Sequence, residues 1–148
     1  MRVVIIGGVA AGPKTASKII RMRPDADITI LEKGEFLSYA GCGLPYYISG
    51  DVKEQRNLME TPAGAVRDAA FFQNVKNLKV KSGVEVVEID RKGRRVRAKV
   101  LATGEESWLP YDALVIATGA SPVIPKIPGA AIPSAVRRDF EQGAMRCG

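Results

Sequence analysis

The stretch Arg2-Val3-Val4-Ile5-Ile6-Gly7-Gly8-Val9-Ala10-Ala11-Gly12 decides the fold of this chain. Residues 3–6 form a continuous β-branched run that ends in glycines, which is typical of a parallel strand buried on both faces. From Pro13 onward, Ala16, Ile19 and Ile20 recur at helical spacing. The order strand, tight turn, helix therefore predicts the beginning of an α/β fold with a parallel sheet.

The turn partly matches the dinucleotide-binding fingerprint G-x-G-x-x-G. Gly7 and Gly12 supply its first and third glycines, and Val9 stands at the middle position. Residues 27–31 are expected to form the second strand, and Glu32 follows 20 residues after Gly12, where a carboxylate accepts ribose hydroxyls. An exposed acid at a strand end is the alternative. The whole pattern favours a dinucleotide whose phosphates lie at the N-terminus of the following helix.

That helix carries a basic stripe of Lys14, Lys18 and Arg21. At about 100° per residue, the three side chains fall within an arc of about 60°. An ordinary solvated helix face is one interpretation. The other is a binding surface for an anionic second ligand, because the stripe adjoins the glycine turn.

The segment Ser38-Tyr39-Ala40-Gly41-Cys42-Gly43-Leu44-Pro45-Tyr46-Tyr47 holds a cysteine between small residues, just before an apolar run able to start a helix. A helix N-terminus lowers the pKa of a thiol and favours the reactive thiolate. The alternative is a buried, inert cysteine, which is common.

The middle of the chain changes from helical to strand patterns. Residues 51–60 are predicted to form a surface loop, and Thr61-Pro62 resembles the start of a helix that runs to about Asn74, with Ala65, Ala69 and Phe72 as core residues. Residues 84–89 and 96–101, and a return through Trp108, predict an antiparallel meander in which Trp108 is a packing residue.

Residues 111–119 restore the pattern of a buried strand that ends in a small-residue turn. We expect this strand to lie beside the first one, so that 117–119 and 7–12 meet in one crevice at the carboxyl ends of the strands. The proline-rich stretch 122–133 predicts a linker, and the residues after it have no clear pattern.

Composition narrows the class of protein. With 148 residues and 46% hydrophobic content, one globular domain is expected. Only Cys42 and Cys147 are present, and no secretory signal precedes them, so we expect a reducing, cytoplasmic compartment. No apolar run reaches the ~20 residues of a membrane helix. The net charge is +6, and the basic residues are not interleaved with aromatic residues, so they suit anionic cofactors better than nucleic acid. The absence of histidine disfavours a metal site.

Four segments together resemble the FAD domain of the pyridine nucleotide-disulfide oxidoreductases. They are the turn 7–12, Glu32-Lys33, the cysteine segment 38–47 and the strand 111–119, in this order. The resemblance covers about residues 1–129 and is to the single-cysteine branch: coenzyme A-disulfide reductases, NADH-dependent persulfide or polysulfide reductases, and NADH oxidases and peroxidases. Val9 fits, because this branch often lacks the middle glycine.

The resemblance implies a Rossmann-like FAD-binding domain in three layers, with a parallel sheet and an antiparallel meander. It assigns the FAD pyrophosphate to the turn, the adenosine ribose to Glu32, an adenine contact to the Val86 backbone and a second flavin contact to 117–119. The implied cofactor-binding residues are Gly7, Gly8, Val9, Ala10, Ala11, Gly12, Glu32, Lys33, Val86, Ala117, Thr118 and Gly119.

The resemblance also implies a reaction. Dithiol relatives carry a second cysteine where Tyr47 stands, so Cys42 must act alone as the redox-active residue. The implied coenzyme A contacts are Lys14, Lys18, Arg21, Ser38 and Lys76. Gly41 departs from an asparagine often found there, which leaves the tightness of coenzyme A binding open. The oxidases and peroxidases typically have a histidine where Ala10 stands, which argues against them.

Family members continue into nicotinamide-binding and dimerisation domains that are missing here, so we expect a fragment with an unpatterned tail at 130–148. The first hypothesis is an FAD-dependent NAD(P)H oxidoreductase that acts on coenzyme A disulfide, persulfide or polysulfide, and whose parent is a homodimer. The second is a non-catalytic FAD-binding module. NADH and NADPH are not distinguished by these residues.

Overall fold

In the computed structural model, a parallel sheet of four strands forms the centre of the fold, in the order β3-β2-β1-β7. The structure describes residues 1–120 and 126, so the predicted linker and tail lie outside the described residues except for Lys126. The strands are β1 (Arg2–Ile6), β2 (Asp27–Leu31), β3 (Lys79–Lys81) and β7 (Ala113–Ile116). The expected placement of the last strand beside the first is confirmed, because β1 pairs in parallel with both β2 and β7.

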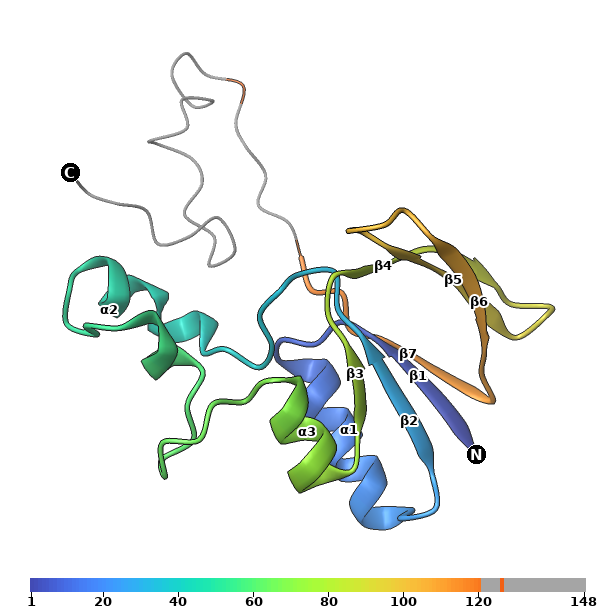
Figure 1. Cartoon of the computed structure of the whole chain (residues 1–148), viewed down its shortest axis with the longest axis horizontal. Helices are drawn as coiled ribbons and strands as arrows, with labels where there is room; N and C mark the ends of the chain where they lie inside the picture. Colours follow the sequence, from blue (N-terminus) through green and yellow to red (C-terminus); the bar gives the residue numbers. More distant parts are fainter. Residues whose placement is uncertain (121–125, 127–148) are drawn as a thin grey trace.

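The sheet lies between two other layers (Figure 1). Helices α1 (Ala11–Met22) and α3 (Ala69–Lys76) cover one face. The antiparallel meander of β4 (Val84–Asp90), β5 (Arg95–Val100) and β6 (Glu106–Pro110) covers the other. The three-layer α/β architecture and the meander are therefore confirmed.

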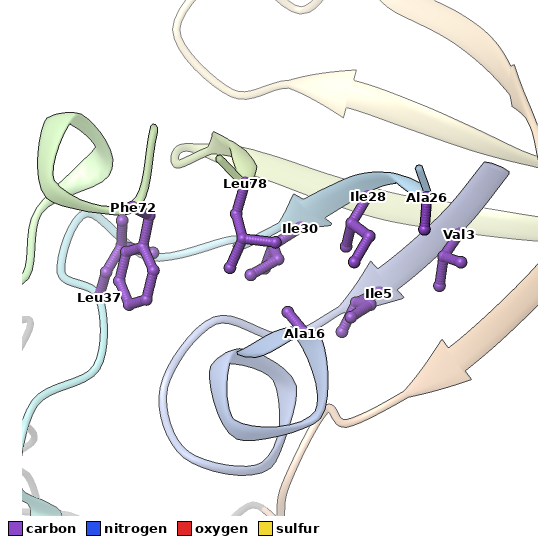
Figure 2. Close-up of a cluster of buried hydrophobic side chains, with 9 residues drawn as sticks. All are labelled: Val3, Ile5, Ala16, Ala26, Ile28, Ile30, Leu37, Phe72 and Leu78. Atoms are coloured by element: carbon purple, nitrogen blue, oxygen red, sulfur yellow. The ribbon is translucent and has the colours of Figure 1, made fainter. Parts of the chain in front are cut away.

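Alternation along β1 explains why both faces are covered. Val3 and Ile5 point into the helix-side core, where Ala16 of α1 and Ile30 of β2 meet them (Figure 2). Val4 and Ile6 point to the opposite core, beneath the meander. Because successive strand residues face opposite sides, an uninterrupted apolar run buries all its side chains only between two layers.

The ends of β1 and β7 are held together by the Arg2–Asp112 pair. The Arg2 guanidinium donates to Asp112 Oδ1 at 3.0 Å, and the Arg2 backbone N–H donates to Oδ2 at 2.7 Å. These hydrogen bonds favour the ionised carboxylate, so the pKa of Asp112 lies below its usual value.

The predicted helix from Thr61 is wrong, because α3 begins eight residues later, at Ala69. Gly64, with a φ of 79°, has left-handed backbone, and the Thr61 hydroxyl accepts the Ala65 N–H, so this stretch forms a turn. The cap of α3 is Asp68, whose side chain accepts the Phe71 N–H at 2.7 Å. Ala65 is exposed outside the helix, against the prediction.

The other predicted core residues of this region lie on α3. Phe72 is buried, and Ala69 packs against the same core.

Trp108 lies on the outer face of the meander, where the Arg95 guanidinium covers its ring at 4.3 Å. Trp108 is therefore a partly exposed packing residue of that face.

The cysteine segment and the loop after it lie beside the helical layer (Figure 1). Gly41–Gly43 form a 3-10 turn, α2 (Leu44–Ile48) follows, and Gln55–Leu58 form a second 3-10 turn inside the predicted surface loop. Within the described residues, no helix combines the length and apolar character needed to cross a membrane.

We predict that Gly12→Ala destabilises the fold, although alanine is the better helix former by about 1 kcal/mol. A Cβ at this position would lie 1.8 Å from the Gly7 carbonyl oxygen, which is backbone and cannot move aside. The free energy of unfolding in urea should fall by about 1–3 kcal/mol. Gly41→Ala is the matched control, because its Cβ would meet only Tyr39, at 4.0 Å. Equal stability of the two variants would contradict the packing argument.

Candidate functional site

A cavity of about 590 Å³ opens at the carboxyl ends of the parallel strands, and we call it the strand-end cavity. It is bounded by the ends of β1, β2 and β7 and by the start of β4. The structure brings together here most of the residues predicted to bind the cofactor: Gly7, Val9, Ala10, Ala11, Glu32, Lys33, Val86, Ala117, Thr118 and Gly119. The predicted crevice between 7–12 and 117–119 is therefore present.

Gly8 and Gly12, also predicted as cofactor contacts, are buried and do not line this cavity. Their lack of side chains allows neighbouring segments of the chain to pack closely against the turn. A Cβ on Gly8 would lie 2.9 Å from Glu32 Cβ, and one on Gly7 would lie 2.2 Å from the Ala117 carbonyl oxygen. Gly7 also has a φ of 108°, which favours glycine. The turn therefore brings β1, β7 and α1 into backbone contact.

Glu32 is the buried acid of the strand-end cavity, with 8% of its surface exposed. Its Oε2 accepts the Gly8 N–H at 2.5 Å and its Oε1 accepts the Gly34 N–H at 2.7 Å. Burial excludes the alternative of an exposed strand-end acid. The carboxylate fixes the glycine turn, and each oxygen retains a further lone pair for a donor in the cavity. Its contact with a ribose stays a prediction.

The N-terminus of α1 lies at the same cavity. The helix begins at Ala11 after Ala10, and no side chain caps it and no acid lies in its first turn. The first N–H groups of a helix lack intrahelical partners, and the helix dipole makes this end attractive to anions. Because Ala10 and Ala11 both line the cavity, the chemistry of this wall suits a phosphate group.

A second cavity, of about 420 Å³, lies between α1, the cysteine segment and α3, and we call it the α1–α3 cavity. Of the predicted coenzyme A contacts, it brings together Lys14, Ser38 and Lys76. Lys18 and Arg21 lie exposed further along α1 and do not line it. Its three cationic side chains are Lys14, Lys76 and Arg67, and among the described residues that line it there is no Asp or Glu. The charges favour a polyanionic ligand.

Sequence reasoning missed several residues of this cavity, of which Arg67 is the most important. The predicted helix from Thr61 to about Asn74 includes Arg67 and indicates no contact between its side chain and the cysteine segment. The structure places it at the end of a turn instead, and its guanidinium donates to the carbonyls of Ser38 and Glu60. The glycine of that turn, Gly64, was the sequence signal that could have located it.

The two cavities share a wall. Val9, Ala10 and Tyr39 line both of them. A ligand in one cavity is therefore separated from a ligand in the other by the glycine turn and one aromatic ring.

Cys42 is an exposed free cysteine, so the alternative of a buried, inert thiol is wrong. It lies in the 3-10 turn that precedes α2, in agreement with the prediction of a helix start. Cys42 lines neither of the two cavities, but Tyr39, three residues before it, lines both. Gly43 lets the turn pack tightly, because a Cβ there would lie 2.6 Å from Leu58 Cδ2.

Comparison with known proteins assigns the family. The chain belongs to the pyridine nucleotide-disulphide oxidoreductases, whose family profile matches residues 1–144. It is 36% identical over 144 residues to an NAD(P)H sulfur oxidoreductase (CoA-dependent) of Pyrococcus furiosus, covering 97% of this chain and 30% of that protein. It is 35% identical over 120 residues to a coenzyme A disulfide reductase of Staphylococcus haemolyticus, covering 80% of this chain and 26% of the relative.

A solved structure of similar sequence and fold supports the same family assignment. A NAD-dependent persulfide reductase from A. fulgidus superposes with a TM-score of 0.83 and 50% identity, over 86% of this chain and 23% of the other. The chain thus spans less than a third of the length of these relatives. The resemblance inferred from the sequence motifs is confirmed at the level of the family.

We predict that Glu32→Gln lowers the free energy of unfolding by about 1–3 kcal/mol, because the amide NH₂ would face one of the two backbone N–H donors and leave it unpaired. Urea unfolding measures the change. Glu85→Gln is the matched control: Glu85 lines the same cavity, but its partner is the exposed Lys33 ammonium. Equal losses for both variants would mean that Glu32 does not fix the turn.

Proposed function

We propose that this chain is the FAD-binding part, residues 1–129, of an NAD(P)H-dependent oxidoreductase that reduces coenzyme A disulfide, a persulfide or a polysulfide through Cys42. The observation that carries the proposal is the shared wall of Val9, Ala10 and Tyr39. It separates a cavity suited to a dinucleotide from a cationic cavity, and its aromatic member lies three residues before an exposed thiol. The names of the relatives agree with this chemistry.

The residues of the strand-end cavity fit FAD. The uncapped N-terminus of α1 offers N–H groups to a diphosphate, and the missing side chain of Gly7 lets the turn pack against the strand end where that group would lie. The Glu32 carboxylate would accept a ribose hydroxyl, and Lys33 and the Val86 backbone would lie along the adenosine. Ala117, Thr118 and Gly119 would contact the flavin half.

The α1–α3 cavity fits the phosphates of coenzyme A. Lys14 and Lys76 lie on the two helices that flank it, and Ser38 adds a hydroxyl from the cysteine segment. Coenzyme A carries several phosphate charges, which cationic side chains bind by charge-assisted hydrogen bonds. Lys18 and Arg21 would extend the cationic surface of α1 beyond the cavity.

Cys42 would carry the chemistry. Its thiolate attacks one sulfur of the substrate disulfide, the S–S bond breaks, coenzyme A leaves as a thiolate, and a mixed disulfide with Cys42 remains. FAD, when bound, supplies the two electrons of NAD(P)H that reduce this mixed disulfide. The products are then the Cys42 thiolate and, with one proton, the second coenzyme A thiol. Since Tyr47 stands where dithiol relatives carry a second cysteine, no disulfide within segment 38–47 competes.

NADH oxidase activity is the alternative within the family. It is disfavoured because Ala10, on the shared wall, cannot transfer protons as the histidine typical of those enzymes would. A non-catalytic FAD-binding module would have the same strand-end cavity but no reactive Cys42.

We predict that the chain binds FAD, measured as quenching of flavin fluorescence on titration. Ala10→Asp should weaken binding by at least about tenfold, because its carboxylate would repel the diphosphate. Aspartate is also a favoured helix N-cap, so this variant should keep its stability. Ala10→Asn is the control, since it caps equally well without charge. Absence of binding, or equal affinity of the two variants, would contradict the assignment of this cavity.

We predict that coenzyme A disulfide forms a mixed disulfide at Cys42, detected by mass spectrometry as the gain of one coenzyme A, and that Cys42→Ser abolishes it. The rate should saturate with concentration, and Lys76→Ala should raise the half-saturation concentration about three- to tenfold. Lys92→Ala, at the tip of the β4–β5 hairpin, removes the same charge far from the cavity and should change nothing. Modification at Cys147 alone would overturn the proposal.

A further inference from the structure

We propose that Arg67 is a positioning residue that fixes residues 38–43, the segment that carries Cys42. The inference rests on the proposed role of Cys42 and adds to it a residue 25 positions further along the chain. Arg67 lines the α1–α3 cavity beside Lys14 and Lys76, and its charge alone would suggest an ordinary anion contact. Its hydrogen bonds indicate a different role.

The guanidinium of Arg67 bridges two backbone carbonyls. Nη1 donates to the Ser38 oxygen at 3.0 Å, and Nη2 donates to the Glu60 oxygen at 2.6 Å. A planar guanidinium can hold two acceptors in a fixed relation, which an ammonium on a flexible stem does less well. Arg67 therefore links the start of the cysteine segment to the loop that follows α2.

Ser38 is the point where such a link matters most. It is a non-glycine residue with a φ of 48°, a left-handed conformation that costs free energy and persists only where neighbouring groups impose it. Its N–H donates to the Gly8 carbonyl at 2.9 Å, and its carbonyl accepts from Arg67. The peptide groups on both sides of Ser38 are thus fixed, one to the glycine turn and one to Arg67.

The loop that presents Arg67 is itself ordered by backbone contacts. Glu60 and Val66 form an antiparallel bridge, and the Arg67 N–H donates to the Met59 carbonyl at 3.0 Å. The same loop holds the cysteine segment at a second point, since the Ala40 N–H donates to the Leu58 carbonyl at 2.8 Å. Leu58 is 4% exposed and its side chain packs against Gly43. Residues 58–67 therefore hold the segment on both sides of Tyr39.

The position of residues 38–43 should affect the rate at which Cys42 reacts. The attack of the Cys42 thiolate on a disulfide requires the sulfur to meet a substrate held by the cationic side chains, and a displacement of about 1 Å from the reactive geometry can lower the rate by up to about a hundredfold. Loss of the Arg67 link should leave the ligand's charge partners Lys14 and Lys76 intact while releasing the backbone before Cys42. Substrate affinity and maximal rate should then change separately.

The test compares the formation of the mixed disulfide between Cys42 and coenzyme A in the wild-type chain, Arg67→Lys, Arg67→Ala and Lys76→Ala. Arg67→Lys keeps the charge and removes the planar fork, and it should lower the maximal rate at least about tenfold with the half-saturation concentration within about twofold. Lys76→Ala should instead raise the half-saturation concentration and leave the maximal rate nearly unchanged. If Arg67→Lys matches the wild type and Arg67→Ala raises only the half-saturation concentration, Arg67 is an anion contact and the inference is wrong.

Hydrogen exchange followed by mass spectrometry gives a readout that needs no substrate. Amides in 38–43 should exchange at least about tenfold faster in both Arg67 variants, while those of β1 and β2 keep their protection, which shows that the fold is intact. Unchanged exchange in 38–43 would overturn the inference. If the wild-type chain forms no mixed disulfide at all, the proposed function is wrong, and the exchange measurement alone still decides whether Arg67 fixes this segment.

Discussion

The close approach of three backbone segments at the end of β1 is the constraint on which the rest of the structure depends. Gly7 lies against the carbonyl of Ala117, and Gly12 lies against the carbonyl of Gly7, with no space for a side chain at either position. This contact sets where β7 ends and where α1 begins. Both cavities are bounded by the same turn, because Val9 and Ala10 line both of them.

A buried carboxylate completes this arrangement from the neighbouring strand. Glu32 follows β2 directly, and its backbone N–H donates to the Lys81 carbonyl while its own carbonyl accepts the Val84 N–H. Its side chain turns back to the N–H groups of Gly8 and Gly34. One residue thereby joins the parallel sheet, the meander and the glycine turn. This carboxylate can be buried because each of its two oxygens accepts a hydrogen bond from a backbone N–H.

Much of this fold could be predicted from the sequence because the decisive patterns are local. The apolar run of β1 specifies a strand buried on two faces, and the extent of β2 was predicted correctly. The buried pattern predicted over 111–119 is wrong for β7, which is only half-buried and leaves Ile116 64% exposed. β3 was not predicted, because three residues with two lysines carry no signal of a parallel strand. α3 was placed too early because Thr61-Pro62 suits a turn as well as a helix. The role of Arg67 was missed because its hydrogen bonds to the Ser38 and Glu60 carbonyls depend on tertiary structure.

The short strand β3 also affects the tendency of copies of this chain to associate through the sheet edge. It lies at one edge of the parallel sheet, where unpaired backbone groups could recruit a strand from another chain. Lys79 and Lys81 are exposed on either side of Val80, and the strand ends after three residues. Charge repulsion and the small number of available hydrogen bonds make this edge a poor template for intermolecular β-pairing, which protects the sheet against aggregation.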